Sequence, residues 1–305
     1  MNAPTSSTGL ALATQAVTKR YGRRTALDGI DLRVPDGAVY VLVGANGAGK
    51  STAFKLAMNL ERPDSGTVEV LGMDASGRGP EVRAQVGYVP EHPVQAYRWM
   101  TCGRLLQHVA AYYPGWDGPY AERLIRGLGL RLEQRAGTLS KGESRRLQLV
   151  LAMAHRPRLL LLDEPTDGLD PMARNKALAL LTEHLADFPT TVLMSTHHVH
   201  EVDSLADHVG VLRGGRLVAQ LPREELLRTV RRYRLEVPEG WEAPVELQSS
   251  GLRRSAAGRL VQWTFVGEER TVSERLTLAG AKVREVTTLG LEDAALAFLP
   301  EELTP

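Results

Sequence analysis

A glycine-rich loop carries the clearest chemical signal in this sequence. Residues 44–52 fit the pattern G-x-x-x-x-G-K-[ST], and they follow an apolar run and open a helical segment. Glycine lets the backbone curl so that its N–H groups point at phosphate oxygens, and the next helix adds its positive N-terminal dipole. The residues expected to contact nucleotide are Gly44, Ala45, Asn46, Gly47, Ala48, Gly49, Lys50, Ser51 and Thr52. In this interpretation Lys50 contacts the β- and γ-phosphates, Ser51 binds Mg²⁺ and Thr52 contacts the α-phosphate.

The alternative is a glycine-rich turn that fits the pattern by chance. Only six of the 37 lysine and arginine residues are lysines, so a lysine at position 50 argues against chance. The position of the loop between a strand and a helix argues against chance as well.

Two carboxylates end a second apolar run. Residues 159–162 are all leucine and predict a buried strand, and Asp163 and Glu164 follow them. If the chain turns at the end of the strand, both carboxylates can face one cleft. We expect Asp163 to belong to the Mg²⁺ shell and Glu164 to be the general base that deprotonates the attacking water. Taken alone, the pair also fits a polar strand terminus; the phosphate-binding loop upstream favours the catalytic interpretation.

The elements that must position these residues indicate a parallel α/β core. Apolar runs at 39–43, 159–162 and 191–194 predict strands buried on both faces, and helical segments alternate with them. Residues 100–157 are expected to be helical. After about residue 225, short strands and helices predict a small α+β accessory domain. The expected organisation is a disordered tail at 1–9, a nucleotide-binding domain at 10–225 and the accessory domain at 226–305.

Composition bounds the remaining possibilities. The chain has 305 residues and a formal net charge of +1, so no charge excess indicates a nucleic-acid partner. A single cysteine, Cys102, excludes an internal disulfide. We expect no secretory signal and no membrane-spanning helix, because no apolar run approaches the roughly 18 residues that a span needs. Any membrane role must then come from a partner chain.

Further segments, in chain order, resemble the motifs of the ABC ATPase family. Residues 139–143, Leu-Ser-Lys-Gly-Glu, are similar to the signature sequence L-S-G-G-Q, and residues 166–170 resemble the D-loop. Residues 86–91 resemble the Q-loop, with Glu91 where glutamine is usual. Tyr21 matches the aromatic residue that stacks on adenine, and His197 matches the switch histidine that contacts the γ-phosphate. The resemblance covers roughly residues 10–222.

This resemblance implies a P-loop NTPase with a RecA-like parallel sheet core, an antiparallel β-subdomain and a helical signature subdomain. It implies a dimer around two ATP molecules, in which Ser140 and Gly142 of one subunit cap the γ-phosphate held by the other. Asp170 would communicate across the dimer, and Glu91 would act as a sensor near Mg²⁺ or water. Ser140 as a plain helix N-cap and His197 as a structural histidine remain the alternatives.

The resemblance further implies an ATP-hydrolysing subunit of an ABC transporter that drives export through a separate membrane permease. Lys141 and Glu143 are similar to variants in bacterial exporter ATPases. The alternatives are a soluble ABC ATPase of DNA repair or translation, and an importer ATPase. The expected cofactors are ATP and Mg²⁺. The expected partners are a second copy or a homologous subunit, and a permease at the inner face of the plasma membrane, without nucleic acid.

An aromatic cluster in the expected helical region has two interpretations. Its rings either line a groove for a helix of the partner or pack the core of the helical subdomain. Its members are Tyr97, Trp99, Tyr112, Tyr113 and Trp116.

Overall fold

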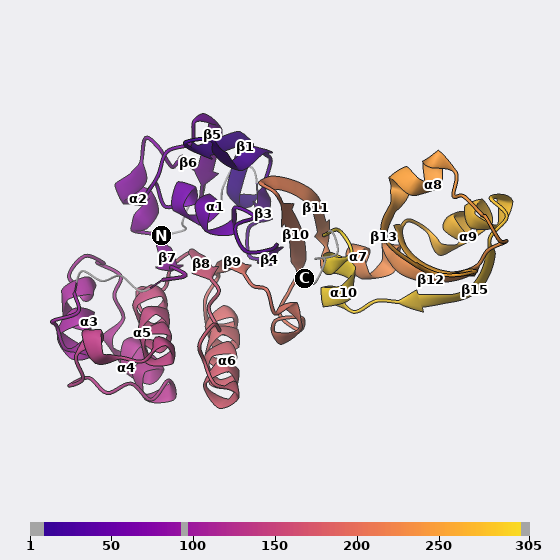
Figure 1. The fold of residues 1–305 in the computed structure, drawn as a ribbon. Helices are drawn as coiled ribbons and strands as arrows, with labels where there is room; N and C mark the ends of the chain where they lie inside the picture. Colours follow the sequence, from indigo (N-terminus) through magenta and orange to yellow (C-terminus); the bar gives the residue numbers. More distant parts are fainter. Residues whose placement is uncertain (1–8, 93–96, 300–305) are drawn as a thin grey trace.

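A six-stranded, mostly parallel sheet forms the centre of the computed structural model, which describes residues 9–92 and 97–299 (Figure 1). The strand order is β11-β10-β4-β9-β8-β7, with only β11 antiparallel to its neighbour. The strands are β4 (Val39–Val43), β7 (Val86–Val89), β8 (Leu159–Asp163), β9 (Thr191–Ser195), β10 (His208–Arg213) and β11 (Arg216–Pro222). Apart from Gly9, the expected N-terminal tail lies outside the described residues.

The three apolar runs are β4, β8 and β9, and every residue in them is buried. Alternate side chains enter two different cores: Leu160 and Leu162 face one, while Leu159 and Leu161 face the other. Helix α1 (Lys50–Ala57) packs in the second core through Phe54, and α5 (Lys141–Met153) and α6 (Pro171–Asp187) pack in the first. A sheet covered on both faces requires continuous apolar strands, so the expected α/β core is confirmed.

A second, antiparallel sheet packs above α1. Its order is β2-β1-β5-β6, with β3 paired to β1. Its strands are β1 (Leu10–Tyr21), β2 (Arg24–Ile30), β3 (Arg33–Pro35), β5 (Ser65–Val70) and β6 (Met73–Asp74), and α2 (Gly79–Arg83) leads from it to β7. This sheet is the expected antiparallel β-subdomain, and its hairpin between β1 and β2 brings Tyr21 towards the glycine-rich loop.

The helical subdomain is less continuous than its sequence suggests. Residues 100–157 contain α3 (Cys102–Ala110), α4 (Gly118–Gly127), the 3₁₀ turn η1 (Ala136–Thr138) and α5. Side-chain caps at Thr101, Asp117 and Ser140 start the three α-helices by accepting backbone N–H groups. Proline and glycine between the caps end each preceding helix, so the expected helical region consists of three separate α-helices.

The aromatic cluster is partly exposed and partly packed against other side chains. Trp99 and Tyr112 are 67% and 70% exposed. Tyr97 and Trp116 pack against the core, and Tyr113 stacks on His155 with ring centroids 4.0 Å apart.

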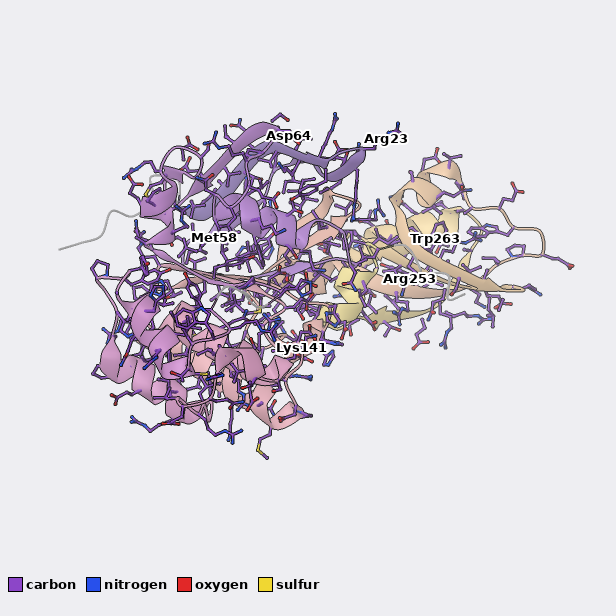
Figure 2. All side chains as sticks on the ribbon, turned by 60° about the vertical axis from the view of Figure 1, so that its left-hand side comes forward. Arg23, Met58, Asp64, Lys141, Arg253 and Trp263 are labelled. Carbon is purple, nitrogen blue, oxygen red and sulfur yellow. The ribbon has the colours of Figure 1, made fainter. Side chains whose placement is uncertain are left out.

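The C-terminal part of the chain forms a separate lobe in Figure 1 with a four-stranded antiparallel sheet of order β13-β14-β12-β15. Its elements are β12 (Val230–Glu236), α8 (Val245–Ser250), β13 (Gly251–Ala257), β14 (Leu260–Val266), α9 (Glu269–Leu278) and β15 (Lys282–Thr288). This βαββαβ order is the split βαβ, or ferredoxin-like, arrangement. Its core contains Tyr233, Trp263 and Phe265, and Figure 2 shows Trp263 well away from Lys141 at the start of α5.

Two short helices join this lobe to the rest of the molecule. The chain enters it through α7 (Arg223–Thr229) and leaves it through α10 (Leu291–Leu296), which packs against α7 and the 3₁₀ turn η2 (Val199–Glu201). Leu291 and Ala294 of α10 belong to the same core as β8. The domain boundary near residue 225 stays a prediction. None of the helices in the described ranges has the length and hydropathy that a bilayer crossing requires.

Gly87 in β7 provides a test of the packing between the sheet and the signature helix. A Cβ atom at Gly87 would lie 2.1 Å from the Ala152 carbonyl oxygen in α5. Because that neighbour is backbone, we expect Gly87→Ala to lower the free energy of unfolding by about 1–3 kcal/mol. Urea unfolding measures the change. Gly118→Ala is the control, because nothing lies within 4 Å of its Cβ; equal effects of the two substitutions would contradict the packing described.

Candidate functional site

A cavity of about 210 Å³ lies where β8 ends beside the glycine-rich loop and α1. Ten of its lining residues were predicted from the sequence, and two, Arg24 and Ala26, were not. The lining residues are Tyr21, Arg24, Ala26, Asn46, Gly47, Gly49, Lys50, Ser51, Thr52, Glu91, Asp163 and Glu164. Ligand sites at the carboxyl ends of parallel strands are the rule in open α/β sheets, because adjacent strand ends and helix N-termini meet there.

The glycine-rich loop is held in a shape that only glycine allows at two positions. Gly47 and Gly49 have φ angles of +78° and +113°. A Cβ atom at Gly49 would lie 2.5 Å from the Ala26 carbonyl oxygen. Lys50 is buried, and its side chain extends back along the loop. Its Nζ donates to the Gly44 carbonyl at 2.6 Å and to the Ala45 carbonyl at 3.4 Å. Gly44, Ala45 and Ala48 complete the loop without lining the cavity.

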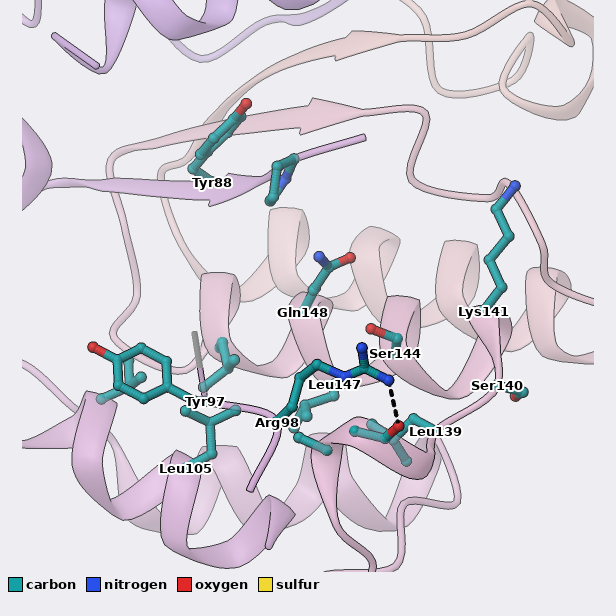
Figure 3. Close-up of a pocket in the computed structure, with 15 residues that line it drawn as sticks. Tyr88, Tyr97, Arg98, Leu105, Leu139, Ser140, Lys141, Ser144, Leu147 and Gln148 are labelled. Carbon is teal, nitrogen blue, oxygen red and sulfur yellow. Dashed lines mark hydrogen bonds between the residues drawn. The ribbon is translucent and has the colours of Figure 1, made fainter. Parts of the chain in front are cut away.

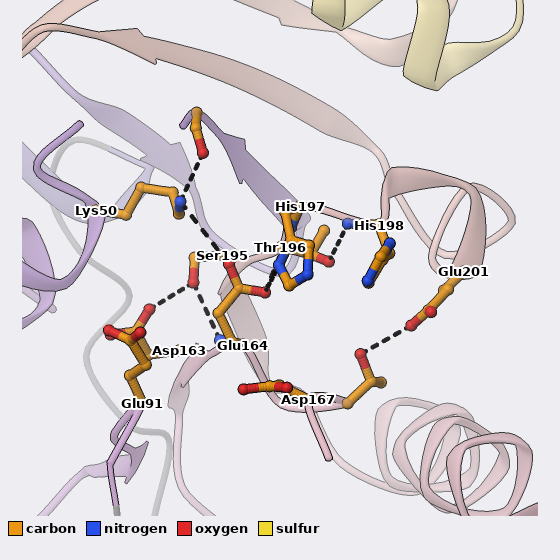
Figure 4. A network of polar contacts seen from close by, with 12 residues as sticks. Lys50, Glu91, Asp163, Glu164, Asp167, Ser195, Thr196, His197, His198 and Glu201 are labelled. Carbon is orange, nitrogen blue, oxygen red and sulfur yellow. Dashed lines mark hydrogen bonds and ion pairs between the residues drawn. The ribbon is translucent and has the colours of Figure 1, made fainter. Parts of the chain in front are cut away.

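The two carboxylates at the end of β8 both reach this cavity. Glu164 has a φ angle of +50°, a left-handed conformation that is costly for a residue with a side chain and that concentrates at functional sites. Its Oε1 lies 3.8 Å from Lys50 Nζ, and its Oε2 lies 2.8 Å from His197 Nδ1 (Figure 4). The turn therefore places Glu164 between a lysine and a histidine.

Asp163 is oriented by a residue from the neighbouring strand. Ser195 Oγ, at the end of β9, donates to Asp163 Oδ1 at 2.5 Å and accepts from the Glu164 N–H at 3.1 Å. The other oxygen, Asp163 Oδ2, is buried and has no hydrogen-bond partner among the described residues. Ser51 Oγ donates to Glu91 Oε2 at 3.2 Å on the same cavity wall. Serine and carboxylate oxygens so grouped are the ligands that a hard divalent cation takes.

Tyr21 lies at the edge of the cavity and is 43% exposed. Its hydroxyl donates to the Glu61 carboxylate, and Lys19 Nζ lies 5.5 Å from its ring centroid. Burial and the bond to Glu61 raise the pKa of Tyr21, so the ring stays neutral at physiological pH. An exposed aromatic face beside a phosphate-binding loop suits a flat base.

Besides His197 and the three loop residues named above, three predicted residues lie outside the cavity of this chain. Ser140 caps α5: its Oγ accepts from the Glu143 N–H at 3.2 Å, and Glu143 Oε2 accepts from the Ser140 N–H at 2.9 Å. Asp170 caps α6 by accepting from Ala173 N–H at 2.9 Å. Gly142 packs against Gly168, whose carbonyl oxygen would lie 2.6 Å from a Cβ at position 142. A single chain does not bring these residues to the nucleotide cavity.

Three residues near the cavity were missed in the sequence. Arg24 Nη2 donates to the Gly47 carbonyl at 2.8 Å, Ser195 orients Asp163, and Arg145 in α5 is buried behind the cavity. Arg145 carried a readable signal, because it stands four residues before the buried Leu149 and eight before the buried Met153. A charged residue at an apolar position of a helix indicates a buried polar role. Arg24 and Ser195 carried no such signal.

Lys141, which replaces the first signature glycine, forms an ion pair with Asp167 at 2.6 Å. Burial alone would raise the pKa of Asp167. Its hydrogen bond to Lys141 and the charges of Lys141, Arg145 and His197 outweigh that effect, so the pKa of Asp167 lies below its ordinary value of 3.8. A carboxyl group whose pKa is lower in the folded chain than in the unfolded chain stabilises the fold at pH values above its unfolded-state pKa. That contribution is lost as the pH falls through its folded-state pKa.

We therefore expect Lys141→Ala to lower the free energy of unfolding at pH 7 by less than about 1 kcal/mol, since the pair is partly exposed. The difference from the unsubstituted chain should disappear at pH values well below 3.8. Urea unfolding at several pH values measures it, with Lys176→Ala on the exposed side of α6 as the control. A difference that persists in acid would show that Lys141 acts through packing instead.

The comparisons with known proteins agree with this geometry. A family model described as ABC transporter matches residues 27–167. The bacitracin transport ATP-binding protein BcrA of Enterococcus faecalis is 34% identical over 242 residues, which cover 78% of each protein. The Nod factor export ATP-binding protein I of Ralstonia nicotianae is 34% identical over 222 residues, covering 71% of this chain and 68% of that protein.

Among solved structures, one titled as the ATP-binding subunit of an ABC transporter is similar, with a TM-score of 0.65 and 30% identity. The match covers 72% of this chain and 92% of that chain. The fold is therefore that of a P-loop NTPase, as expected. The chain belongs to the family of ABC transporter ATP-binding proteins, and it is an ATPase that binds ATP.

Proposed function

We propose that this ATPase drives export through a separate membrane permease and hydrolyses ATP in the cavity between the glycine-rich loop and the end of β8. The observation that carries the proposal is the meeting of Lys50, Asp163 and Glu164 in that cavity. The name of one relative, bacitracin transport, supports a role in transport, and the name of the other, Nod factor export, supports its direction. They do not favour the alternatives of an importer ATPase or of a soluble ATPase in DNA repair or translation.

The side chains in the cavity have distinct roles in this proposal. The loop N–H groups and Lys50 bind the phosphates, Thr52 contacts the α-phosphate, and Tyr21 stacks on adenine. Ser51, Asp163 and Glu91 would hold Mg²⁺, and the free Oδ2 of Asp163 supports that assignment. When bound, the ion would neutralise charge on the phosphates.

Glu164 is the proposed general base, and His197 holds it in place. The oxygen of water forms a bond to the γ-phosphorus while the bond to the β–γ bridging oxygen breaks, and ADP and phosphate leave. The proton of the water passes to Glu164. The contact of 2.8 Å between His197 Nδ1 and Glu164 Oε2 orients the carboxylate, and the other ring nitrogen is left to contact the γ-phosphate.

The signature residues act across a dimer in this proposal. Ser140 and Gly142 lie outside the cavity of their own chain, so a second subunit is needed to bring them to ATP. Ser140, the cap of α5, and Lys141, its first residue, are exposed, so the positive N-terminal end of the helix is open to an anion. Asp170, at the start of α6, would transmit closure between the two subunits. The same γ-phosphate would then hold the dimer closed until hydrolysis.

A groove beside the helical subdomain is the proposed docking site for the permease, which would hold this ATPase at the inner face of the plasma membrane. It encloses about 350 Å³, and Pro90 and Val109 are among its lining residues. Tyr88 lies on one side of it, and Leu105 and Leu147 lie on the other (Figure 3). An apolar groove of this kind accepts an amphipathic helix. Of the aromatic cluster, Tyr97 lines this groove, and Trp99 and Tyr112 are exposed.

Co-purification from the native cell tests the proposal. Tagged Glu164→Gln protein, extracted in mild detergent with ATP and Mg²⁺, should recover a membrane protein with several spans. Adding Trp99→Ala and Tyr112→Ala should reduce that recovery, because both rings are exposed near the groove. Leu278→Ala is the matched control, since Leu278 is 88% exposed on the C-terminal lobe. Recovery of soluble partners alone would contradict the transporter proposal and leave the ATPase assignment intact.

A further inference from the structure

Arg145 is a buried arginine in the helix that begins at the signature residues. It is 2% exposed, and it is the largest of the fully buried residues in the part of the chain that the structure describes. Burying a guanidinium costs several kcal/mol unless hydrogen bonds and opposite charges offset the lost hydration. The contacts of the other two guanidinium nitrogens therefore indicate its role, since its buried Nε has no hydrogen-bond partner among the described residues.

The guanidinium binds the backbone on two sides of the nucleotide cavity. Nη1 donates to the Pro90 carbonyl at 2.6 Å and to the Asp163 carbonyl at 3.4 Å, and Nη2 donates to the Glu91 carbonyl at 2.8 Å. Pro90 and Glu91 follow β7, and Asp163 ends β8. Nη1 also donates to Gln148 Oε1 at 3.3 Å, one turn along α5. One side chain therefore fixes α5 to the two strand ends that carry the carboxylates of the cavity.

The surroundings of Arg145 are strongly acidic. Burial lowers its pKa, and the negative charges of Asp167, Asp163, Glu164 and Glu91 act in the opposite direction. Three of these carboxylates are proposed to face ATP, which is itself an anion. A positive charge behind them reduces the repulsion that would otherwise oppose ATP binding.

We infer that Arg145 is a positioning residue for ATP hydrolysis: it holds Glu91 and Asp163 at a fixed separation and offsets their charge, so that α5 moves together with the cavity. The inference rests on the proposed roles of Glu91 and Asp163. It also bears on the carboxylate at position 91, because Arg145 Nη2 donates to that residue's backbone carbonyl and the negative charge of Glu91 acts on the guanidinium. Displacement of Glu91 when ATP binds or leaves would reach Ser140 and Gly142 through this arginine.

Steady-state ATPase kinetics of Arg145→Gln, Glu91→Gln and the double substitution test the inference. We expect Arg145→Gln to lower kcat by about 10- to 100-fold and to change KM much less, because the carboxylates lose their alignment more than their access to ATP. In the double substitution the loss should be at least about 5-fold smaller than the product of the two single effects, since both changes remove the same electrostatic interaction between the guanidinium and the Glu91 carboxylate. Arg145→Lys keeps the positive charge but loses the planar guanidinium, so its kcat should lie between those of Arg145→Gln and the unsubstituted chain.

Arg146→Gln is the matched control on the same helix. Arg146 Nη1 donates to the Leu128 carbonyl at 2.7 Å, away from the cavity, and we expect kcat within about 2-fold of the unsubstituted chain. Circular dichroism and urea unfolding without nucleotide identify any variant that fails to fold. If Arg145→Gln does not fold, the same comparison is made with Arg145→Lys, Glu91→Gln and the variant that combines them.

An unchanged kcat in Arg145→Gln, or strictly additive effects with Glu91→Gln, would overturn the inference. Failure of the proposed site itself has a different signature, because Glu164→Gln measured in the same series would then retain the activity of the unsubstituted chain. Low Glu164→Gln activity with normal Arg145 variants overturns the role of Arg145 alone.

Discussion

Replacing Glu164 with glutamine should lower kcat for ATP hydrolysis by about 10²- to 10⁴-fold, the contribution expected of a positioned general base. An amide keeps the shape of the side chain but cannot accept the proton of the attacking water. Steady-state release of phosphate with ATP and Mg²⁺ measures the effect. Glu183→Gln makes the same chemical change on the exposed side of α6 and should leave kcat unchanged.

ATP affinity should survive the same substitution. Glu164 faces Lys50 at 3.8 Å, and removing its negative charge takes away repulsion towards the phosphates rather than a contact with them. A loss confined to kcat is the signature of an interaction made only in the transition state. A Glu164→Gln protein that keeps more than about a tenth of the original kcat would mean that another group deprotonates the water.

Replacing Lys50 with alanine should weaken ATP binding. A hydrogen bond to a charged group contributes about 1.5–3 kcal/mol, so losing the contact to phosphate should weaken binding by about 10- to 100-fold. The substitution also leaves Glu164 without the lysine that faces it, which adds repulsion towards ATP. Calorimetric titration with ATP measures the change.

Lys55→Ala is the control for that titration. Lys55 lies in the same helix, is 45% exposed on its side chain and pairs with Glu61 at 3.4 Å. Its removal should change ATP affinity by less than about 2-fold, as is usual for a partly exposed charge. Comparable losses for the two lysines would indicate a general electrostatic effect and would contradict the specific role of Lys50.

The buried strands could be predicted because their environment imposes a simple pattern. Strands β4, β8 and β9 are covered on both faces, so each reads as an unbroken apolar run. Strand β13 and helix α8 had no comparable signal. β13 is an edge strand whose last four residues are exposed, and its composition of arginine, serine and alanine shows no alternation. Its position depends on pairing with β14, which is a tertiary contact.

The site could be predicted where it is local in sequence. The glycine-rich loop and the pair after β8 are short segments whose residue types follow directly from the chemistry of phosphate and water. The φ angle of +50° at Glu164 could not be predicted, although the turn it produces could. Arg145 contacts backbone 54 and 55 residues away along the chain, and no short motif encodes such a contact.

The most direct test of the account is the mass of the Glu164→Gln protein in solution with and without ATP, measured by light scattering. We expect a monomer without nucleotide and a dimer holding two ATP molecules when ATP and Mg²⁺ are present, because Ser140 and Gly142 reach ATP only from a second chain. Ser140→Tyr in the same protein should prevent the dimer and leave binding of one ATP per chain. A Glu164→Gln protein that binds ATP fully and remains a monomer would contradict the proposal that the site is completed across a dimer.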